Sequence, residues 1–255
     1  MADAGLDAAA PAPYGVGFRC SRDSGKTWIP APHTPAAPLF GEPAKPGEPV
    51  KMGSPHFVDF GRNMRHSPDG KAYLVAHGAV PSDPLPRPAN LSWITGGQVY
   101  LARVEPSIPN LNDRGRYEFF AGYDRGGRPR WARQLPAARP LLEWNNNMGC
   151  VTATYNAPLK RYFLCVTDGT DTISRFHTYV LEAGALTGPW RLVVYMRNFG
   201  EQAYFVNIPS KFISPDGRTF WLMYAANFSK YFTGRPNPPG SRYGMCVQEV
   251  RLLAA

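Results

Sequence analysis

Three acidic residues stand where a carboxylate can take part in chemistry. Asp59 interrupts an apolar run between Val58 and Phe60, Asp168 follows an apolar segment, and Glu201 precedes another one. An apolar setting raises the pKa of a carboxyl group, and pairs of carboxylates with different roles carry out glycoside hydrolysis. We therefore predict that Asp59, Asp168 and Glu201 supply the catalytic acid and its partner in a glycan-cleaving site.

Two of these residues also have a structural interpretation. Asp59 can form an ion pair with Arg62 or Arg65, because a buried carboxylate needs a partner. Asp168 directly precedes Gly169 and can cap a turn. The sequence leaves both alternatives open.

Aromatic, amide and imidazole side chains near the same segments are candidates for holding a sugar. Aromatic rings contact sugar faces, and amides bind hydroxyl groups. The predicted substrate-binding residues are His56, Asn63, His77, Trp93, Trp144, Asn207 and Asn227. His56 and His77, together with an arginine, would instead suit a polysaccharide lyase that deprotonates a uronate. Histidines in apolar strands are also common as hydrogen-bonded core residues.

The sequence predicts no metal and no cofactor. Its four cysteines lack the spacing of a zinc site, and it has no glycine-rich phosphate loop, no Gly-x-Ser-x-Gly elbow and no zinc-protease motif. Cys150 and Cys165 flank a predicted hairpin. They can form a disulfide or remain buried thiols.

Three segments with one shared pattern must position these residues. In each, an apolar strand leads through a tight turn to a second apolar strand, and a third strand follows. The turns are Pro68–Gly70, Ala157–Lys160 and Pro215–Gly217. Their proline and glycine residues favour reversals between antiparallel strands. Helical spacing is not sustained anywhere, so the predicted fold class is all-β.

A further motif precedes these segments. Residues 21–28 match the Asp box, Ser-x-Asp-x-Gly-x-Thr-Trp, which resembles the hairpins of sialidase-type propellers. We expect Asp23 to accept N–H groups across its own hairpin, Gly25 to adopt a positive φ, and Trp28 to anchor the turn between sheets. In the proteins that share this box it lies away from the active site, so Asp23 is interpreted as structural.

Repeated antiparallel units of this kind are typical of a β-propeller with four-stranded blades. We predict a disordered lead-in at residues 1–13 and a single propeller domain at 14–255. The domain contains a partial blade at 14–30 and blade-like units at about 53–122, 148–196 and 204–252. These units are too few for a five-bladed ring. We therefore expect an N-terminally incomplete, open ring with an apolar edge on Phe57–Phe60 or Leu222–Tyr224.

Composition and charge agree with this fold and limit the partners. The 255 residues include 25 glycines and 27 prolines, as many short strands joined by turns require. No segment is long and apolar enough to span a membrane, and no signal peptide opens the chain. The net charge of +9 suits an acidic glycan or a nucleic acid, but the arginines are scattered rather than clustered. We expect a polysaccharide or oligosaccharide partner, no nucleic acid and no membrane.

A set of short strings, in order along the chain, resembles one known family. The strings are Phe57–Gly61, Ser92–Gly96, Tyr117–Gly122, Thr154–Asn156, Leu186–Trp190 and Ile208–Phe212. They resemble an uncharacterised family of secreted five-bladed β-propellers that includes endo-D-arabinanases and is related to arabinanases and β-xylosidases. The resemblance implies secretion and hydrolysis of an arabinan-like polysaccharide by paired carboxylates in the central channel. The acidic first blade of this family has no counterpart here, which leaves a non-catalytic carbohydrate-binding propeller, with Trp93 and Trp144 as binding residues, as an alternative.

Overall fold

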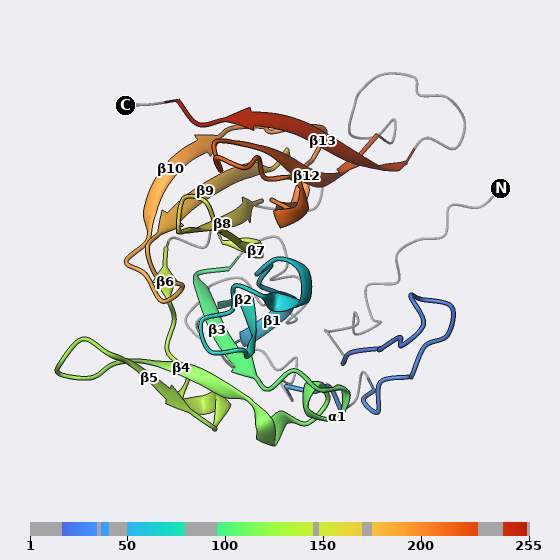
Figure 1. Ribbon diagram of the computed structural model, residues 1–255, viewed down its shortest axis with the longest axis vertical. Helices are drawn as coiled ribbons and strands as arrows, with labels where there is room; N and C mark the ends of the chain where they lie inside the picture. Colours follow the sequence, from blue (N-terminus) through green and yellow to red (C-terminus); the bar gives the residue numbers. More distant parts are fainter. Residues whose placement is uncertain are drawn as a thin grey trace.

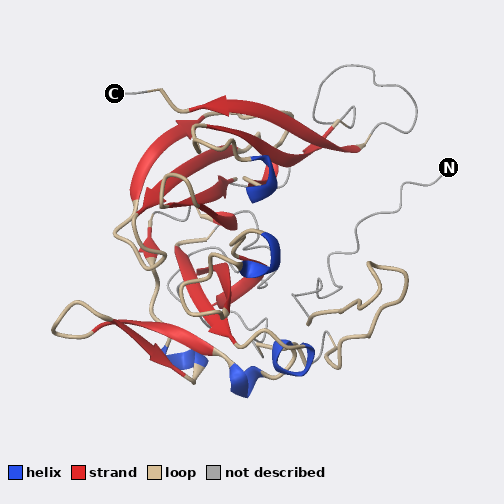
Figure 2. Ribbon diagram, in the orientation of Figure 1, coloured by secondary structure: helices blue, strands red, loops and turns tan. Residues whose placement is uncertain are grey.

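The computed structural model of the chain is built from antiparallel β-sheets with only short helical turns, which confirms the all-β class (Figure 2). It describes residues 17–34, 37–40, 50–79, 96–144, 148–169, 175–228 and 242–253. The predicted lead-in at 1–13 and the candidate Trp93 lie outside these residues.

The first sheet has six strands in the order β1–β2–β3–β4–β5, and β6 pairs with β3. The strands are β1 (Val50–Phe57), β2 (Ala72–Ala79), β3 (Gln98–Val104), β4 (Glu118–Tyr123), β5 (Pro129–Ala132) and β6 (Leu142–Glu143). Every residue of β2 is buried, because its apolar side chains are covered on both faces of the sheet. Strands β5 and β6 are additional to those expected from the sequence.

The second and third sheets are smaller. The second contains β7 (Gly149–Asn156), β8 (Arg161–Asp168), β9 (His177–Ala183) and β10 (Arg191–Met196) in the order β10–β9–β8–β7. The third contains β11 (Tyr204–Asn207), β12 (Thr219–Asn227) and β13 (Tyr243–Arg251) in that order. The second sheet has the four strands expected of a blade. The first sheet has two strands more than expected, β5 and β6, and the third has three strands within the described residues, as the sequence predicts for the last unit.

The three sheets pack face to face, and their innermost strands lie side by side (Figure 1). Backbone bonds at Asp59 and Thr154 link the end of the first inner strand to β7 in parallel, and β7 in turn packs against β11. Val75 and Leu164 lie in the core between the first two sheets. Phe220 lies in the core between the second and the third.

Short helical turns occupy some of the connections. They are α1 (Ile108–Leu111) and the 3-10 turns η1 (Arg62–Met64), η3 (Arg114–Arg116), η4 (Leu135–Ala137) and η5 (Ser210–Phe212). None of the helices in the described part of the chain is long and apolar enough to cross a membrane.

The Asp-box hairpin is closed by backbone bonds between Cys20 and Ile29. As expected, Asp23 accepts the Thr27 amide at 2.9 Å, and Gly25 has a φ of 88°. The expectation for Trp28 is wrong. Its side chain is 59% exposed, and its indole N–H folds back onto the Gly25 carbonyl at 3.1 Å instead of entering a space between sheets.

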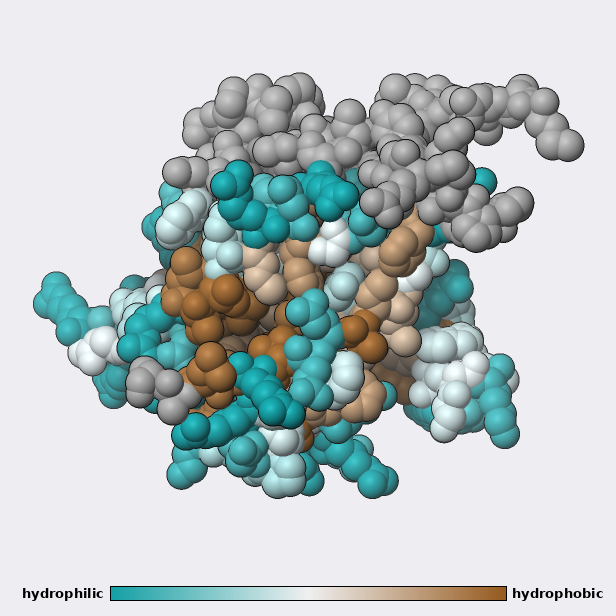
Figure 3. All heavy atoms as spheres, turned by 90° about the horizontal axis from the view of Figure 1, so that it is seen from above, coloured by the Kyte–Doolittle hydropathy of each residue, from teal (hydrophilic) through white to brown (hydrophobic). Residues whose placement is uncertain are grey.

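The third sheet ends on an open strand. Among the described residues, β13 pairs only with β12, and no ladder bonds join it to the Asp-box hairpin. In the two segments expected to form an apolar edge, Phe60 and Leu222 are buried, whereas Phe57 is 43% exposed. Further exposed apolar side chains lie on β13, where Met245 is 75% exposed, and along β10. Figure 3 looks onto this side of the molecule and shows hydrophobic side chains among polar ones.

All four cysteines are thiols that take part in no disulfide, so the alternative of a disulfide between Cys150 and Cys165 is wrong. The register explains this result. Cys165 is opposite Thr152, whereas Cys150 lies in a bulge between Gly149 and Val151. Burial raises the pKa of the Cys165 thiol to about 12, as expected of an inert core thiol.

Candidate functional site

Asp168 is a buried carboxyl group at the end of the second sheet. It is the last residue of β8, is 4% exposed, and lies opposite His177 on β9. Its Oδ2 accepts the Tyr179 hydroxyl at 3.1 Å. Burial raises the pKa of Asp168, while the Tyr179 hydrogen bond and the charge of His177 act in the opposite direction. Such a carboxyl group suits the role of a general acid.

Aromatic rings lie beside this carboxyl group. Tyr179 stacks on Tyr195 with ring centroids 4.5 Å apart, and the Trp144 ring is 6.4 Å from that of Tyr179. Tyr179, Trp144 and Trp190 line a hollow of about 130 Å³ between the first and second sheets. Trp144 is 59% exposed, whereas Nε1 of Trp190 is buried without a hydrogen-bond partner among the described residues. The hollow therefore offers flat apolar faces.

Glu201 lies at the same end of the sheets. The amide of Asn198 donates to Nδ1 of His177 at 2.8 Å, which ties the loop before β11 to the start of β9. Since His177 also pairs with Asp168, the loop brings Glu201 towards the end that holds Asp168. The Glu201 carboxylate forms an ion pair with Arg175, at 3.5 Å.

Two further polar residues hold this loop in place. The Glu201 carbonyl accepts the backbone amide of Asn227 at 2.8 Å, and the Asn227 side chain donates to Oε1 of Gln202 at 3.2 Å. Asn227 is the last residue of β12, so these bonds connect the third sheet to the loop that carries Glu201. We call the end of the sheets formed by Asp168, His177, Tyr179, Glu201 and Asn227 the acidic end.

Asp59 lies at the opposite end and has a different setting. Its carboxylate accepts three hydrogen bonds, from the Gly61 amide at 2.8 Å, the Ser210 amide at 2.8 Å and the Ser210 hydroxyl at 2.7 Å. The expected ion pair with Arg62 or Arg65 is not among its contacts. The carboxylate instead joins the first sheet to the third.

The structure separates Asp59 from Asp168. Asp59 is bridged to Thr154, whereas Gly149 is opposite Thr167, the neighbour of Asp168. Five residues of extended strand between positions 149 and 154 span roughly 17 Å. Paired carboxylates in glycoside hydrolases are at most about 9.5 Å apart. Asp59 and Asp168 therefore do not form such a pair, and Glu201 is the candidate partner of Asp168.

The two candidate histidines are packed into the first sheet. His77 is fully buried opposite Gly53, and its Nε2 lies 2.8 Å from the position that a Cβ would take there. The ring of His56 lies 5.1 Å from that of Phe205, and burial lowers the pKa of this imidazole. A lyase needs a histidine that reaches its substrate, and the full burial of His77 is against that role.

The two remaining candidates, Asn63 and Asn207, are explained by the local backbone structure. Asn63 is exposed, belongs to η1 and has a φ of 56°, a conformation that asparagine tolerates better than most residues. The Asn207 amide donates to the carbonyls of Phe205 and Met223, at 3.0 and 3.3 Å. Neither residue is at the acidic end.

The sequence analysis did not select His177 or Tyr179. The signal was present, because alternate residues of a strand point to the same face. His177 and Tyr179 are two apart in a segment that was expected to be a strand. The antiparallel pairing with the strand ending at Asp168 then places all three side chains together.

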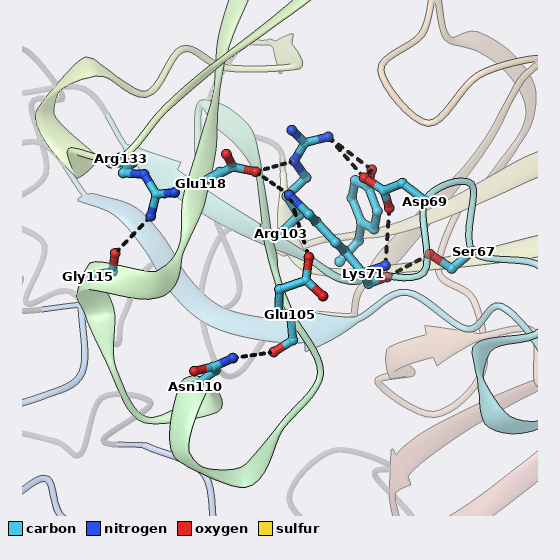
Figure 4. Close-up of polar contacts among 10 residues, drawn as sticks. Ser67, Asp69, Lys71, Arg103, Glu105, Asn110, Gly115, Glu118 and Arg133 are labelled. Atoms are coloured by element: carbon cyan, nitrogen blue, oxygen red, sulfur yellow. Dashed lines mark hydrogen bonds and ion pairs between the residues drawn. The ribbon is translucent and has the colours of Figure 1, made fainter.

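A second charged cluster lies on the outside of the first sheet (Figure 4). Glu118 accepts Lys71 at 2.7 Å and Arg103 at 2.8 Å, and Arg103 also contacts Asp69 at 3.1 Å. The Arg103 guanidinium lies 3.9 Å from the centroid of the Trp131 ring. Acids and bases compensate one another here, so the cluster is a structural network. No group of three or more metal-ligating side chains occurs in the described part of the chain.

Comparisons with known proteins give only weak likenesses. No protein-family model and no curated protein matches the chain. Among solved structures, a glycoside hydrolase family 43 arabinoxylan arabinofuranohydrolase from Bacillus subtilis, in complex with cellotetraose, is similar with 14% sequence identity and a TM-score of 0.42. The match covers 95% of this chain and 43% of that one, so the chain spans less than half of that protein's length. A likeness at this level supports no argument about fold or activity.

Proposed function

We propose that this protein is a glycoside hydrolase whose reaction takes place at the acidic end of the sheets. The observation that carries the proposal is the Asp168 carboxyl group, which is buried, has a raised pKa and lies beside exposed aromatic rings. A carboxyl group of this kind retains its proton to higher pH and can deliver it to a departing sugar oxygen.

In the proposed reaction, Asp168 protonates the glycosidic oxygen as its bond to the anomeric carbon breaks. Glu201 is the second carboxylate, which either activates water or attacks the anomeric carbon itself. Tyr179 positions the Asp168 carboxyl group through its hydroxyl. Trp144 supplies a flat face for a sugar ring.

Four finer statements belong to the same proposal. The side-by-side inner strands support the interpretation of the three sheets as consecutive blades of a propeller. An arabinan-like substrate, membership of the endo-D-arabinanase family and secretion stay predictions, based on the sequence resemblance alone.

The test is sugar release from arabinan, arabinoxylan and a β-glucan by the purified chain. Asp168→Asn and Glu201→Gln should each lower the rate on the active polymer by about a hundredfold or more, while leaving polymer binding in place. Glu249→Gln is the matched control, because Glu249 is an exposed glutamate on β13. Unchanged rates in both site variants would refute the assignment.

A non-catalytic glycan-binding protein is the second candidate, and the exposure of Trp144 favours it. In that case no polymer is cleaved, Trp144→Ala abolishes polymer binding, and Asp168→Asn leaves binding unchanged. Retention of polymers on affinity gels, measured beside sugar release, separates the two functions.

A further inference from the structure

A pocket of about 440 Å³ lies at the end of the sheets opposite the acidic end. Three connections form it, each joining the inner strand of a sheet to the second strand. They contribute residues 61–66 after the first inner strand, 155–158 from the end of β7 onward, and 210–215 after β11. The turns η1 (teal) and η5 (orange) lie on the same side of the sheets in Figure 1. We call this cavity the turn-end pocket.

Hydrogen bonds between sheets fix the walls of the turn-end pocket. Asp59 bonds Ser210, as described, and its backbone carbonyl accepts the Tyr155 amide at 2.9 Å. The Asn156 side chain donates to the Gly217 carbonyl at 2.8 Å. Because each wall is bonded to another sheet, the cavity exists before a ligand arrives. A preformed cavity of this volume is typical of small-molecule sites.

The charged groups of the pocket are basic. Arg62, Arg65 and Lys211 line it, and none of them has a carboxylate partner within the described residues. Arg65 instead donates its Nε to the ring of His66 at 3.0 Å, and Lys211 lies 4.8 Å from the centroid of a phenylalanine ring. Asp59 forms no ion pair with any of them, and its carboxylate accepts three hydrogen bonds from Gly61 and Ser210 instead.

The remaining lining is suited to a sugar ring. Tyr155 presents an aromatic ring, Pro158 and Pro215 add apolar surface, and the hydroxyls of Ser210 and Ser214 lie beside them. Flat apolar surface binds the C–H faces of a sugar, and hydroxyls bind its polar rim. Guanidinium groups pair with planar carboxylates through two parallel hydrogen bonds.

We propose that the turn-end pocket is a binding site for an acidic saccharide, with Arg62 and Arg65 holding the carboxylate of a uronate residue. The volume accommodates one or two sugar rings. The site is separate from the acidic end, so it binds glycan without cleaving it. This inference goes beyond the proposed function and does not depend on it.

The test is calorimetric titration of the full chain with digalacturonate and, in parallel, with neutral galactobiose. Digalacturonate should bind at least about tenfold more tightly than galactobiose, and the double variant Arg62→Ala/Arg65→Ala should lose at least about tenfold in affinity. The two arginines are exposed, so their removal leaves the fold intact. Arg125→Ala, at an exposed arginine of the turn between β4 and β5, should change the affinity by less than about twofold.

Three outcomes would overturn the proposal: no binding of digalacturonate, equal binding of the two sugars, or equal losses in the Arg125 control and the double variant. Inorganic phosphate is titrated as well. If it binds more tightly than digalacturonate, the pocket takes phosphate and the saccharide assignment is wrong. Asp168→Asn should leave digalacturonate affinity unchanged, which separates a failure here from a failure of the proposed hydrolase.

Discussion

The two ends of the sheets each present an aspartate from an apolar strand, and the two carboxyl groups have opposite environments. At the turn end, Asp59 accepts three hydrogen bonds from two other segments. At the acidic end, Asp168 accepts one hydrogen bond among the described residues, from Tyr179, and burial has the largest effect on its pKa. An acid flanked by apolar residues is therefore no sign of catalysis by itself. The number of donors around it distinguishes a structural carboxylate from a proton donor.

The largest expected effect is on stability, at Asp59. Asp59→Ala removes an acceptor that joins the first and third sheets and leaves the amides of Gly61 and Ser210 without it. The free energy of unfolding should fall by about 2–4 kcal/mol. Urea denaturation followed by tryptophan fluorescence measures the loss. Ser210→Ala, which removes only the hydroxyl bond, should cost about 1 kcal/mol. An unchanged midpoint for Asp59→Ala would show that Asp59 does not join the sheets.

The next effect is a dependence of stability on pH, at Asp168. Its pKa is higher in the folded chain than the usual 3.8, so the folded state binds more protons in the interval between the two values. The contribution of Asp168 to stability therefore falls as the pH rises from about 3.8 through the folded pKa. Asp168→Asn should abolish this fall. At pH values above the folded pKa of Asp168, the variant should be more stable than the unsubstituted chain. Parallel unfolding curves at several pH values test this, and identical slopes in the two proteins would contradict it.

A smaller effect is expected from Tyr179→Phe. The Tyr179 hydroxyl stabilises the ionised form of Asp168, so its loss should raise the pKa of Asp168 further. Titration of the carboxyl carbon by NMR measures the shift directly. In the hydrolase, the pH at which Asp168 loses its proton should rise in the activity profile as well. A downward shift would mean that the hydroxyl does not donate to Asp168.

The smallest effect concerns a third carboxylate, the exposed Asp23. Donors on Ser21 and Thr27 lower the pKa of Asp23 to about 2, with the Thr27 hydroxyl as the largest cause. The stabilisation of the hairpin is therefore present above pH 3.8 and lost as the pH falls towards 2. The amide resonance of Thr27 should move in that interval, with little change in global stability. Asp23→Asn should lack the transition.

Much of the fold was predictable because short-range patterns determine it. The turns at Pro68–Gly70 and Pro215–Gly217 identified the reversals, and apolar runs identified the inner strands. Strands β5 and β6 escaped prediction because Pro129–Ala132 and Leu142–Glu143 are short and partly polar, so they carry little periodicity. The contacts of Trp28 were not predicted either, since the exposure of its side chain depends on whether another sheet lies beside the hairpin.

The candidate site was predictable only in part. The structure places Asp168 and Glu201 at the acidic end, and the Trp144 ring lies beside that of Tyr179. Asp59 was grouped with them because the sequence does not show at which end of the sheets each residue lies. Its partner Ser210 is 151 residues away, and no local pattern indicates so distant a contact.

The same distance along the chain has a consequence for the order of folding. The bonds between Asp59 and Ser210 close a loop that includes the whole second sheet, so they form only after that sheet can bring its neighbours together. Hairpins such as β7–β8 join neighbouring segments of the chain and can form earlier. We expect substitutions at Asp59 to speed unfolding and leave the refolding rate almost unchanged, as is typical of contacts made after the rate-limiting step. The Asp59 carboxylate would then stabilise the packing of the sheets only after the sheets have assembled.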